Sequence, residues 1–169
     1  RDSYKATSSL ALNSGTIKDA VLNVATLTLV SPAASGSLGA NKAIVIDTTV
    51  PTVTAVTSTK ADGTYKQGEV IPITVTFSEL VNVTGTPQIT LETGGTDAVV
   101  NYTSGTGSNT LTFNYTVAAG HTSADLDYVA TSSLALNSGT IKDAGLNVAT
   151  LTLVSPAAYG SLGNSKAIV

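Results

Sequence analysis

Hydrophobic and polar residues alternate with a period of two along much of the chain. The clearest examples are "PTVTAVTST" at residues 51–59 and "EVIPITVTFSE" at residues 69–79, which carries Ile71, Ile73 and Val75. A strand places successive side chains on opposite faces, so this alternation predicts strands with one buried face. The same pattern predicts further short strands over residues 87–93, 97–103, 109–117, 125–130, 134–136, 140–145, 148–154 and 166–169.

Turn-forming residues separate these predicted strands. The sequences "GG" at residues 94–95 and "SGTGSN" at 104–109 are typical of turns. Pro72 lacks a backbone N–H, so it predicts an edge or a bulge early in its strand. Because many short strands follow one another and no sustained helical stripe is present, residues 50–169 are predicted to form an all-β fold, an antiparallel immunoglobulin-like β-sandwich.

The chain contains a long internal repeat. Residues 1–45 return 124 positions later as residues 125–169, and 37 of the 45 positions are identical. From Ala6 onwards the copies differ at four positions: Val21 against Gly145, Ser35 against Tyr159, Ala40 against Asn164, and Asn41 against Ser165. We expect the first two differences to lie in loops. The chain is therefore predicted to hold the C-terminal half of one repeat with its linker, residues 1–49, and then one complete repeat, residues 50–169.

The linker "AIVIDTTVPTVT" is predicted to be stiff. Pro51 fixes its own φ angle and biases Val50 towards an extended conformation. The side chains of Asp47, Thr48 and Thr49 can bond to nearby backbone amides. The last strand of one repeat can then continue into the first strand of the next.

The half repeat at the N-terminus has no matching first half within this chain. Alone, residues 1–45 would expose strand edges and the apolar side chains of Leu10, Leu12, Ile17, Leu27 and Leu29. We therefore expect something to cover them. The candidates are a neighbouring molecule that adds a strand, an upstream part of a longer chain, and a polymer in which chains overlap.

Charge and composition exclude several classes of protein. A net charge of -3 with a pI near 4.8 provides no basic patch, so we expect no nucleic-acid partner. No apolar run is long enough for a membrane span and no signal peptide opens the chain, so we expect a soluble, mature or excised piece. The absence of cysteine removes disulfides, thiolate metal sites and thiol nucleophiles.

Catalysis has little support in the sequence. The only histidine is His121, the nucleophile motif "GxSxG" is not found, and no spacing selects a catalytic pair of acids. We predict that the chain is not an enzyme and that His121 is a surface loop residue. Tyr102, Tyr115 and Tyr128 are candidates for a sugar-binding platform, or for half-buried packing residues with the hydroxyl at the rim.

Acidic and amide side chains suggest a calcium site. Calcium prefers about six to eight oxygen ligands, which Asp, Glu and Asn supply together with backbone carbonyls. The candidate ligands are Asp47, Glu79, Asp125, Asp127, Asp143 and Asn147, and the first copy holds Asp19 and Asn23 as counterparts of the last two. The alternative interpretation is that these residues form turns, cap backbone groups and contact solvent.

Several phrases occur in an order that resembles a known family. They are "KAIVIDTTVPTVT", "ITVTFSE", "VTGTPQITLETGG", "TLTFNYTVAAGHTSADLDYVA" and "LNSGTIKDAGLN". Together they resemble the tandem bacterial Ig-like repeats of very large, repetitive cell-surface proteins of the adhesin type. The resemblance implies stalks and adhesive surfaces that are secreted, often rigidified by calcium, and not catalytic. The loop "KDAGLN" departs from the common family pattern, because Leu146 stands between the glycine and Asn147.

Three functional hypotheses follow. The first is a structural and adhesive repeat of an extracellular bacterial surface protein, a stalk or adhesion array, with copies of the same protein and surface glycans or proteins as partners. The second is a self-assembling subunit of an extracellular filament held by strand complementation between chains. The third is a carbohydrate-binding accessory module.

Overall fold

The computed structural model describes residues 3–169 and contains two compact units. We call Arg1–Asp47 unit 1 and Thr48–Val169 unit 2. The elements are α1 (Leu38–Asn41), β1 (Val53–Ser58), β2 (Val70–Thr84), β3 (Gln88–Leu91), β4 (Ala98–Ser104), β5 (Ser108–Thr116), β6 (Leu134–Ala135), β7 (Thr140–Lys142) and α2 (Leu162–Ser165). In the described part of the chain, neither of these four-residue helices is long enough to cross a membrane.

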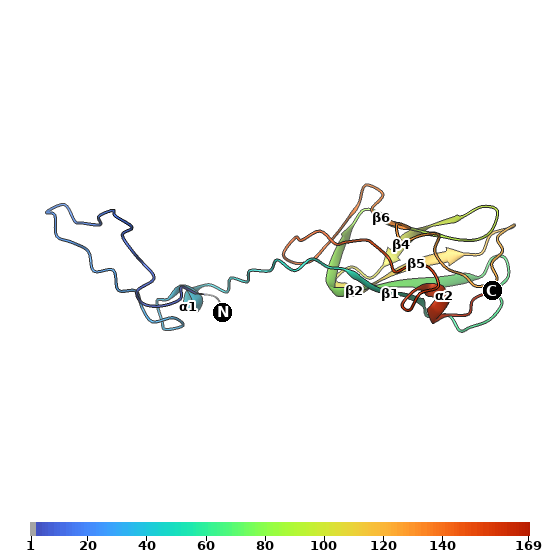
Figure 1. Cartoon of the computed structure of the whole chain (residues 1–169), viewed down its shortest axis with the longest axis horizontal. Helices are drawn as coiled ribbons and strands as arrows, with labels where there is room; N and C mark the ends of the chain where they lie inside the picture. The colour runs from blue at the N-terminus through green and yellow to red at the C-terminus, as the bar shows by residue number, and fades with distance from the viewer. Residues whose placement is uncertain (1–2) are drawn as a thin grey trace. The chain divides into compact units, whose positions relative to one another are not determined.

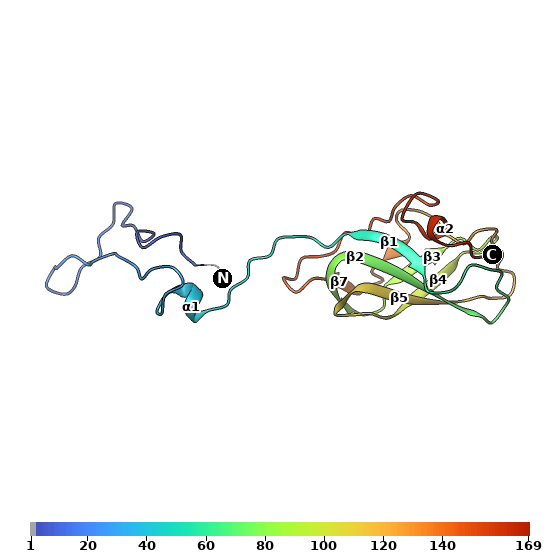
Figure 2. The ribbon, with the colours of Figure 1, turned by 90° about the horizontal axis from the view of Figure 1, so that it is seen from below.

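The strands of unit 2 form one curled antiparallel sheet. The strand order is β1-β2-β5-β4-β3-β6, and β7 pairs with β2 outside this path. Figure 1 shows β2 beside β1 and β5, and Figure 2 shows β7 at the far end of β2. The all-β class predicted from the alternation is therefore confirmed.

The long strand β2 takes part in three ladders, and its residues 73–77 pair with β1. Its first part, Val70–Thr76, pairs with β5, and its last part, Asn82–Thr84, pairs with β7. The register shifts between Thr76 and Val81, which is where the sheet bends. Pro72 lies beyond the last β2 residue paired with β1 and faces only β5, so the expectation of a local edge at this proline is confirmed.

The core of unit 2 is built by two stretches of chain. We call residues 48–124 the front segment and residues 125–169 the back segment. The front segment contributes to the core every second residue of its strands. The back segment contributes apolar residues, most of which lie outside strands. The fully buried side chains include Ile71, Ile73, Phe77, Ile89, Leu91, Leu111 and Phe113 from the front segment, and Tyr128, Ile141, Leu162 and Ile168 from the back segment. Neither segment encloses this core alone.

Three predicted strands of the back segment are wrong. Residues 125–130, 148–154 and 166–169 lie outside the strands and form only isolated bridges, among them Leu91 with Tyr128 and Gly63 with Ile168. The alternation there marks which side chains are buried, and a partly buried chain does not need a continuous ladder. Its backbone meets the front segment at separate points.

Unit 1 repeats the local structure of the back segment. Ser37 caps α1 as Ser161 caps α2, because each hydroxyl accepts a hydrogen bond from the backbone N–H three residues later. Val21 is 75% exposed and Tyr159 is 93% exposed, and both lie outside helices and strands. The expectation that these differences between the copies fall in loops is confirmed.

Candidate functional site

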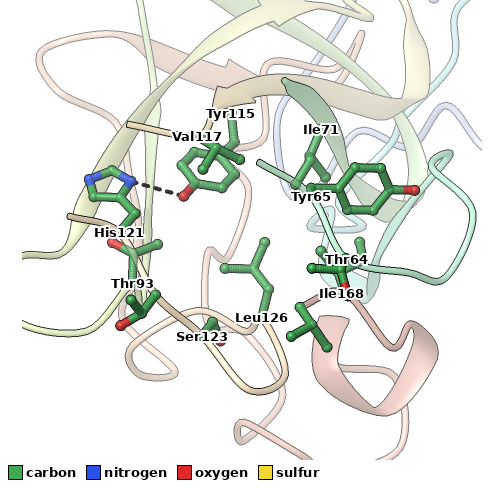
Figure 3. Close-up of a pocket in the computed structure, with 12 residues that line it drawn as sticks. Thr64, Tyr65, Ile71, Thr93, Tyr115, Val117, His121, Ser123, Leu126 and Ile168 are labelled. Atoms are coloured by element: carbon green, nitrogen blue, oxygen red, sulfur yellow. Dashed lines mark hydrogen bonds between the residues drawn. The ribbon is translucent and has the colours of Figure 1, made fainter. Parts of the chain in front are cut away.

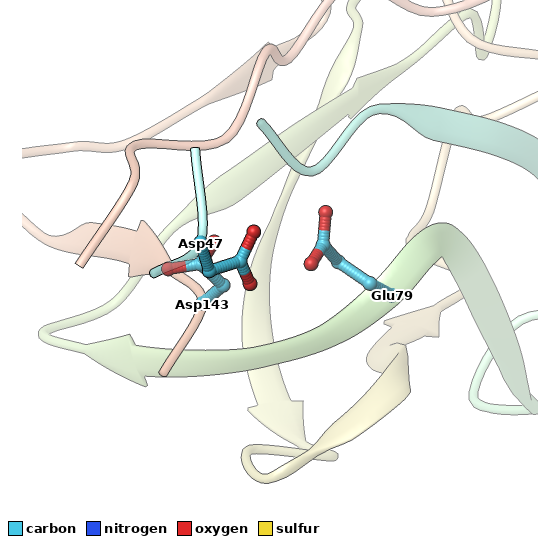
Figure 4. Close-up of side chains that lie close together, drawn as sticks. All are labelled: Asp47, Glu79 and Asp143. Atoms are coloured by element: carbon cyan, nitrogen blue, oxygen red, sulfur yellow. The ribbon is translucent and has the colours of Figure 1, made fainter. Parts of the chain in front are cut away.

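Three of the six predicted metal ligands lie close together. Asp47, Glu79 and Asp143 each offer a carboxylate oxygen, and these oxygens lie within 4.8 Å of one another (Figure 4). Glu79 lies on β2, Asp143 directly follows β7, and Asp47 directly precedes the first residue of unit 2. Three carboxylates at this spacing are the hard oxygen donors that a divalent cation such as calcium prefers.

Asn147 joins this group through Asp143. The Asp143 carboxylate accepts the backbone N–H of Asn147 at 2.8 Å on one oxygen and the Asn147 side-chain amide at 2.8 Å on the other. Asp143 is only 3% exposed. Each carboxylate oxygen has a second lone pair, so these hydrogen bonds leave acceptor capacity for a cation.

The first copy of this loop has the same geometry. Asp19 accepts the backbone N–H of Asn23 at 2.9 Å and its side-chain amide at 2.9 Å. These hydrogen bonds, the side-chain amide first, hold the pKa of Asp19 below its usual value. The carboxylate therefore organises the loop in both copies, although Asp19 is exposed and Asp143 is buried.

Asp125 and Asp127 lie outside the acidic group. Asp125 is exposed. Asp127 accepts the backbone N–H of Ala157 at 2.9 Å and that of Tyr128 at 2.9 Å. Its carboxylate thus ties two parts of the back segment together.

Leu146 adopts a left-handed backbone conformation, with φ 68°. Because this conformation is strained for leucine and its side chain is 71% exposed, we expect Leu146→Gly to raise the free energy of unfolding of unit 2 by about 0.5–1 kcal/mol. Urea unfolding followed by circular dichroism measures this change. The matched control is Gly145→Val, which introduces the residue of the first copy at a position without positive φ and should be near neutral. A loss of stability in Leu146→Gly would contradict the expectation.

A pocket of about 220 Å³ lies in unit 2 where the chain ends (Figure 3). Tyr65, Tyr115, His121, Leu126 and Ile168 are among the residues that line it. No sequence pattern marks this pocket, because its lining residues come from separate stretches of the chain. Its walls are mainly aromatic and aliphatic side chains.

His121 is a loop residue, as predicted, but it is half-buried instead of lying free on the surface. Its ring stacks on Tyr115 with ring centroids 5.8 Å apart, and its Nδ1 lies 2.9 Å from the Tyr115 hydroxyl. Burial raises the pKa of Tyr115. The pair closes one side of the pocket.

The three predicted platform tyrosines are used in packing. Tyr128 is 1% exposed and its hydroxyl donates to the carbonyl of Val154 at 2.6 Å. Burial, together with the charge of Asp127, raises the pKa of Tyr128 to about 12. The half-buried Tyr102 packs edge-on against Phe113, with ring centroids 6.0 Å apart. These contacts fit the packing interpretation, in which the hydroxyl finds a polar partner at the edge of the core.

The described residues thus offer two chemically distinct features, the acidic group of Asp47, Glu79 and Asp143 and a largely apolar pocket that Ile168 and Val169 help to line. The acidic group has the donors of a cation site, and the pocket has the walls of a site for an apolar or aromatic group. Comparison of the chain with protein-family models, with curated protein sequences and with solved structures finds no match.

Proposed function

We propose that this chain is a structural and adhesive repeat of an extracellular bacterial surface protein and has no catalytic role. The observation that carries the proposal is the repeat itself, with 37 identical residues in 45 at a spacing of 124. A period of this length suits a row of separately folded domains, whose purpose is reach and spacing.

The path of the chain through unit 2 supports this proposal. The chain enters unit 2 at Thr52, which lies directly before β1 and forms a bridge to Thr150. It leaves unit 2 after Ile168, which forms a bridge to Gly63. The six residues of β1 lie between these two points along the chain, a length of about 20 Å. Because entry and exit are separated by a strand length, successive units can be joined in a row without folding back.

We infer that unit 2 is an Ig-like β-sandwich. The bend of β2 supports this inference, since its first part pairs with β5 and its last part pairs with β7. In a sandwich, a strand that bends in this way passes from one sheet to the other. The absence of cysteine and tryptophan from the chain separates it from antibody domains.

The coding DNA on both sides of this chain tests the array function. We expect the same open reading frame to contain further copies at 124-residue spacing, and antibodies against unit 2 to label intact bacterial cells. A reading frame without another copy, or labelling only after the cells are permeabilised, would contradict the proposal.

We propose calcium as a structural cofactor at the acidic group. Asp47, Glu79 and Asp143 would supply carboxylate oxygens, and carbonyl groups and solvent would complete the coordination. The ion would relieve the repulsion between three carboxylates that lie within 4.8 Å of one another. Calcium sites of extracellular modules are weak, with dissociation constants of about 0.1–1 mM.

Calcium is therefore expected to raise the melting temperature of unit 2 by about 5 °C or more at about 10 mM, because ligand binding stabilises the folded state by mass action. Thermal unfolding with added calcium and with a chelator measures the shift. Glu79→Gln removes one charged ligand and should abolish most of it. The matched control Asp125→Asn changes an exposed acid outside the group and should keep it. An unchanged melting temperature in the original chain would rule out the site.

A further inference from the structure

Unit 1 keeps the internal hydrogen bonds of the back segment. The backbone N–H of Ala25 bonds to the carbonyl of Ile17 at 2.9 Å, and the equivalent bond from Ala149 to Ile141 is 3.0 Å. The bond from Leu29 to Thr7 has the same length, 2.8 Å, as its counterpart from Leu153 to Thr131. Further equivalent pairs hold both turns and both helices. Unit 1 therefore has the conformation of a back segment before any partner is added.

The two copies differ sharply in the exposure of the same apolar side chains. Ile17 is 46% exposed whereas Ile141 is fully buried. The other pairs behave in the same way. They are Leu10 at 43% against Leu134 at 4%, Leu38 at 45% against Leu162 at 0%, and Ile44 at 44% against Ile168 at 1%. The exposed residues form an apolar face of unit 1, and what covers the same residues in unit 2 is the front segment.

Backbone groups of the front segment meet the back segment at defined positions. The N–H of Thr90 bonds to the carbonyl of Ser133 at 3.0 Å, and the N–H of Val56 bonds to the carbonyl of Gly160 at 2.8 Å. Ile141 pairs in register with Val83. The positions equivalent to Ser133, Gly160 and Ile141 are Ser9, Gly36 and Ile17, and each holds the same residue.

We propose that the apolar face of unit 1 is a docking surface for a second copy of this chain, which supplies its front segment. The surface offers the residues that the front segment already contacts in unit 2, in the same local conformation. A preformed surface of this kind binds without a large ordering cost. The inference rests on the repeat and on exposure, and it concerns residues 1–169 as a separate molecule. In the array of the proposed function, a preceding copy of the repeat would supply the same front segment from within one chain, so association of residues 1–169 and the presence of further copies are tested independently.

The geometry of the linker favours a second copy over the same chain. Docking within one chain would place Val45 where Val169 lies, beside Gly63, while Thr52 lies directly before β1 at the other end of that strand. Seven residues then have to run back along all of β1. They span at most about 25 Å when fully extended, and β1 alone spans about 20 Å. A front segment from another molecule requires no such reversal.

The back segment of each molecule competes with unit 1 of another. Leu126 is 2% exposed in the core, and its counterpart in the first copy is Asp2. Asp127 holds the backbone N–H of Ala157, and its counterpart is Ser3. The back segment therefore offers its front segment an apolar contact that unit 1 lacks, and the Asp127 carboxylate holds two parts of that back segment together. Both differences suppress exchange until the back segment is weakened.

The test weakens the back segment in the full-length chain with Ile141→Asp. We expect this variant to recover β-structure by docking its front segment on unit 1 of another molecule. Light scattering after size exclusion should then show an average mass that rises with concentration to several times that of the monomer. Each molecule offers one surface at each end, so the product is an open head-to-tail chain.

Second variants separate docking from misfolding. In the background of Ile141→Asp, the additional change Ile17→Asp should abolish association and leave an unfolded monomer. Ile17→Asp alone should remain folded in unit 2. The proposal is overturned if Ile141→Asp stays monomeric at every concentration, or if its association is unchanged by Ile17→Asp, which would indicate unspecific aggregation. A folded monomer that depends on Ile17 would assign the surface to the same chain and also overturn it.

Discussion

Replacing Ile141 with alanine is expected to lower the free energy of unfolding of unit 2 by about 3 kcal/mol, and Ile17→Ala is expected to change it by less than about 0.5 kcal/mol. The two residues occupy equivalent positions in identical sequences, "SGTIKDA". Ile141 is 0% exposed and pairs in register with Val83, whereas Ile17 is 46% exposed. The contrast therefore isolates the contribution of the front segment.

Urea unfolding followed by far-ultraviolet circular dichroism measures both variants under one condition. The slope of the transition should stay unchanged in both, because neither substitution alters the surface exposed on unfolding by much. An equal loss in the two variants would show that Ile17 is covered in solution. In that case the dependence of the loss on protein concentration would identify a second molecule as the cover.

The strands of the front segment are the part of the fold that the sequence predicts best. In β2 and β5, alternation places Ile71, Ile73, Leu111 and Phe113 on one buried face. Alternation reports which side of an extended chain is buried, and it does not report whether the backbone pairs continuously. Alternation therefore predicts a strand at residues 148–154, although this segment forms only isolated bridges.

The candidate site was predicted less completely, for a different reason. Chemistry alone suggests Asp125 and Asp127 as strongly as Glu79 and Asp143, because all four are carboxylates. Which carboxylates meet depends on the bend of β2 and on its pairing with β7, which bring Glu79 towards Asp143 across many residues of sequence. A local pattern contains no information about that approach.

Gly139→Ala is expected to lower the free energy of unfolding of unit 2 by about 2–3 kcal/mol, because the new methyl group overpacks a close approach of two backbones. A Cβ atom at Gly139 would lie 2.4 Å from the carbonyl oxygen of Thr84 on β2 and 3.0 Å from that of Leu136. At the equivalent Gly15, a Cβ atom would lie 3.0 Å from the carbonyl oxygen of Leu12, which corresponds to Leu136. Gly15→Ala should therefore change stability by less than about 0.5 kcal/mol.

The difference in stability loss between Gly139→Ala and Gly15→Ala measures the contact with the front segment. The carbonyl oxygens of Leu136 and Leu12 would lie at the same distance, 3.0 Å, from the new Cβ atoms, so they contribute equally to both variants. Neither glycine has a positive φ, so backbone strain does not distinguish them. Thermal unfolding of the two variants gives the comparison, and equal losses would contradict it. If unit 1 receives a front segment from another molecule, Gly15 then approaches a carbonyl equivalent to Thr84. In the background of Ile141→Asp, Gly15→Ala should consequently reduce association even though it leaves the isolated original chain unaffected.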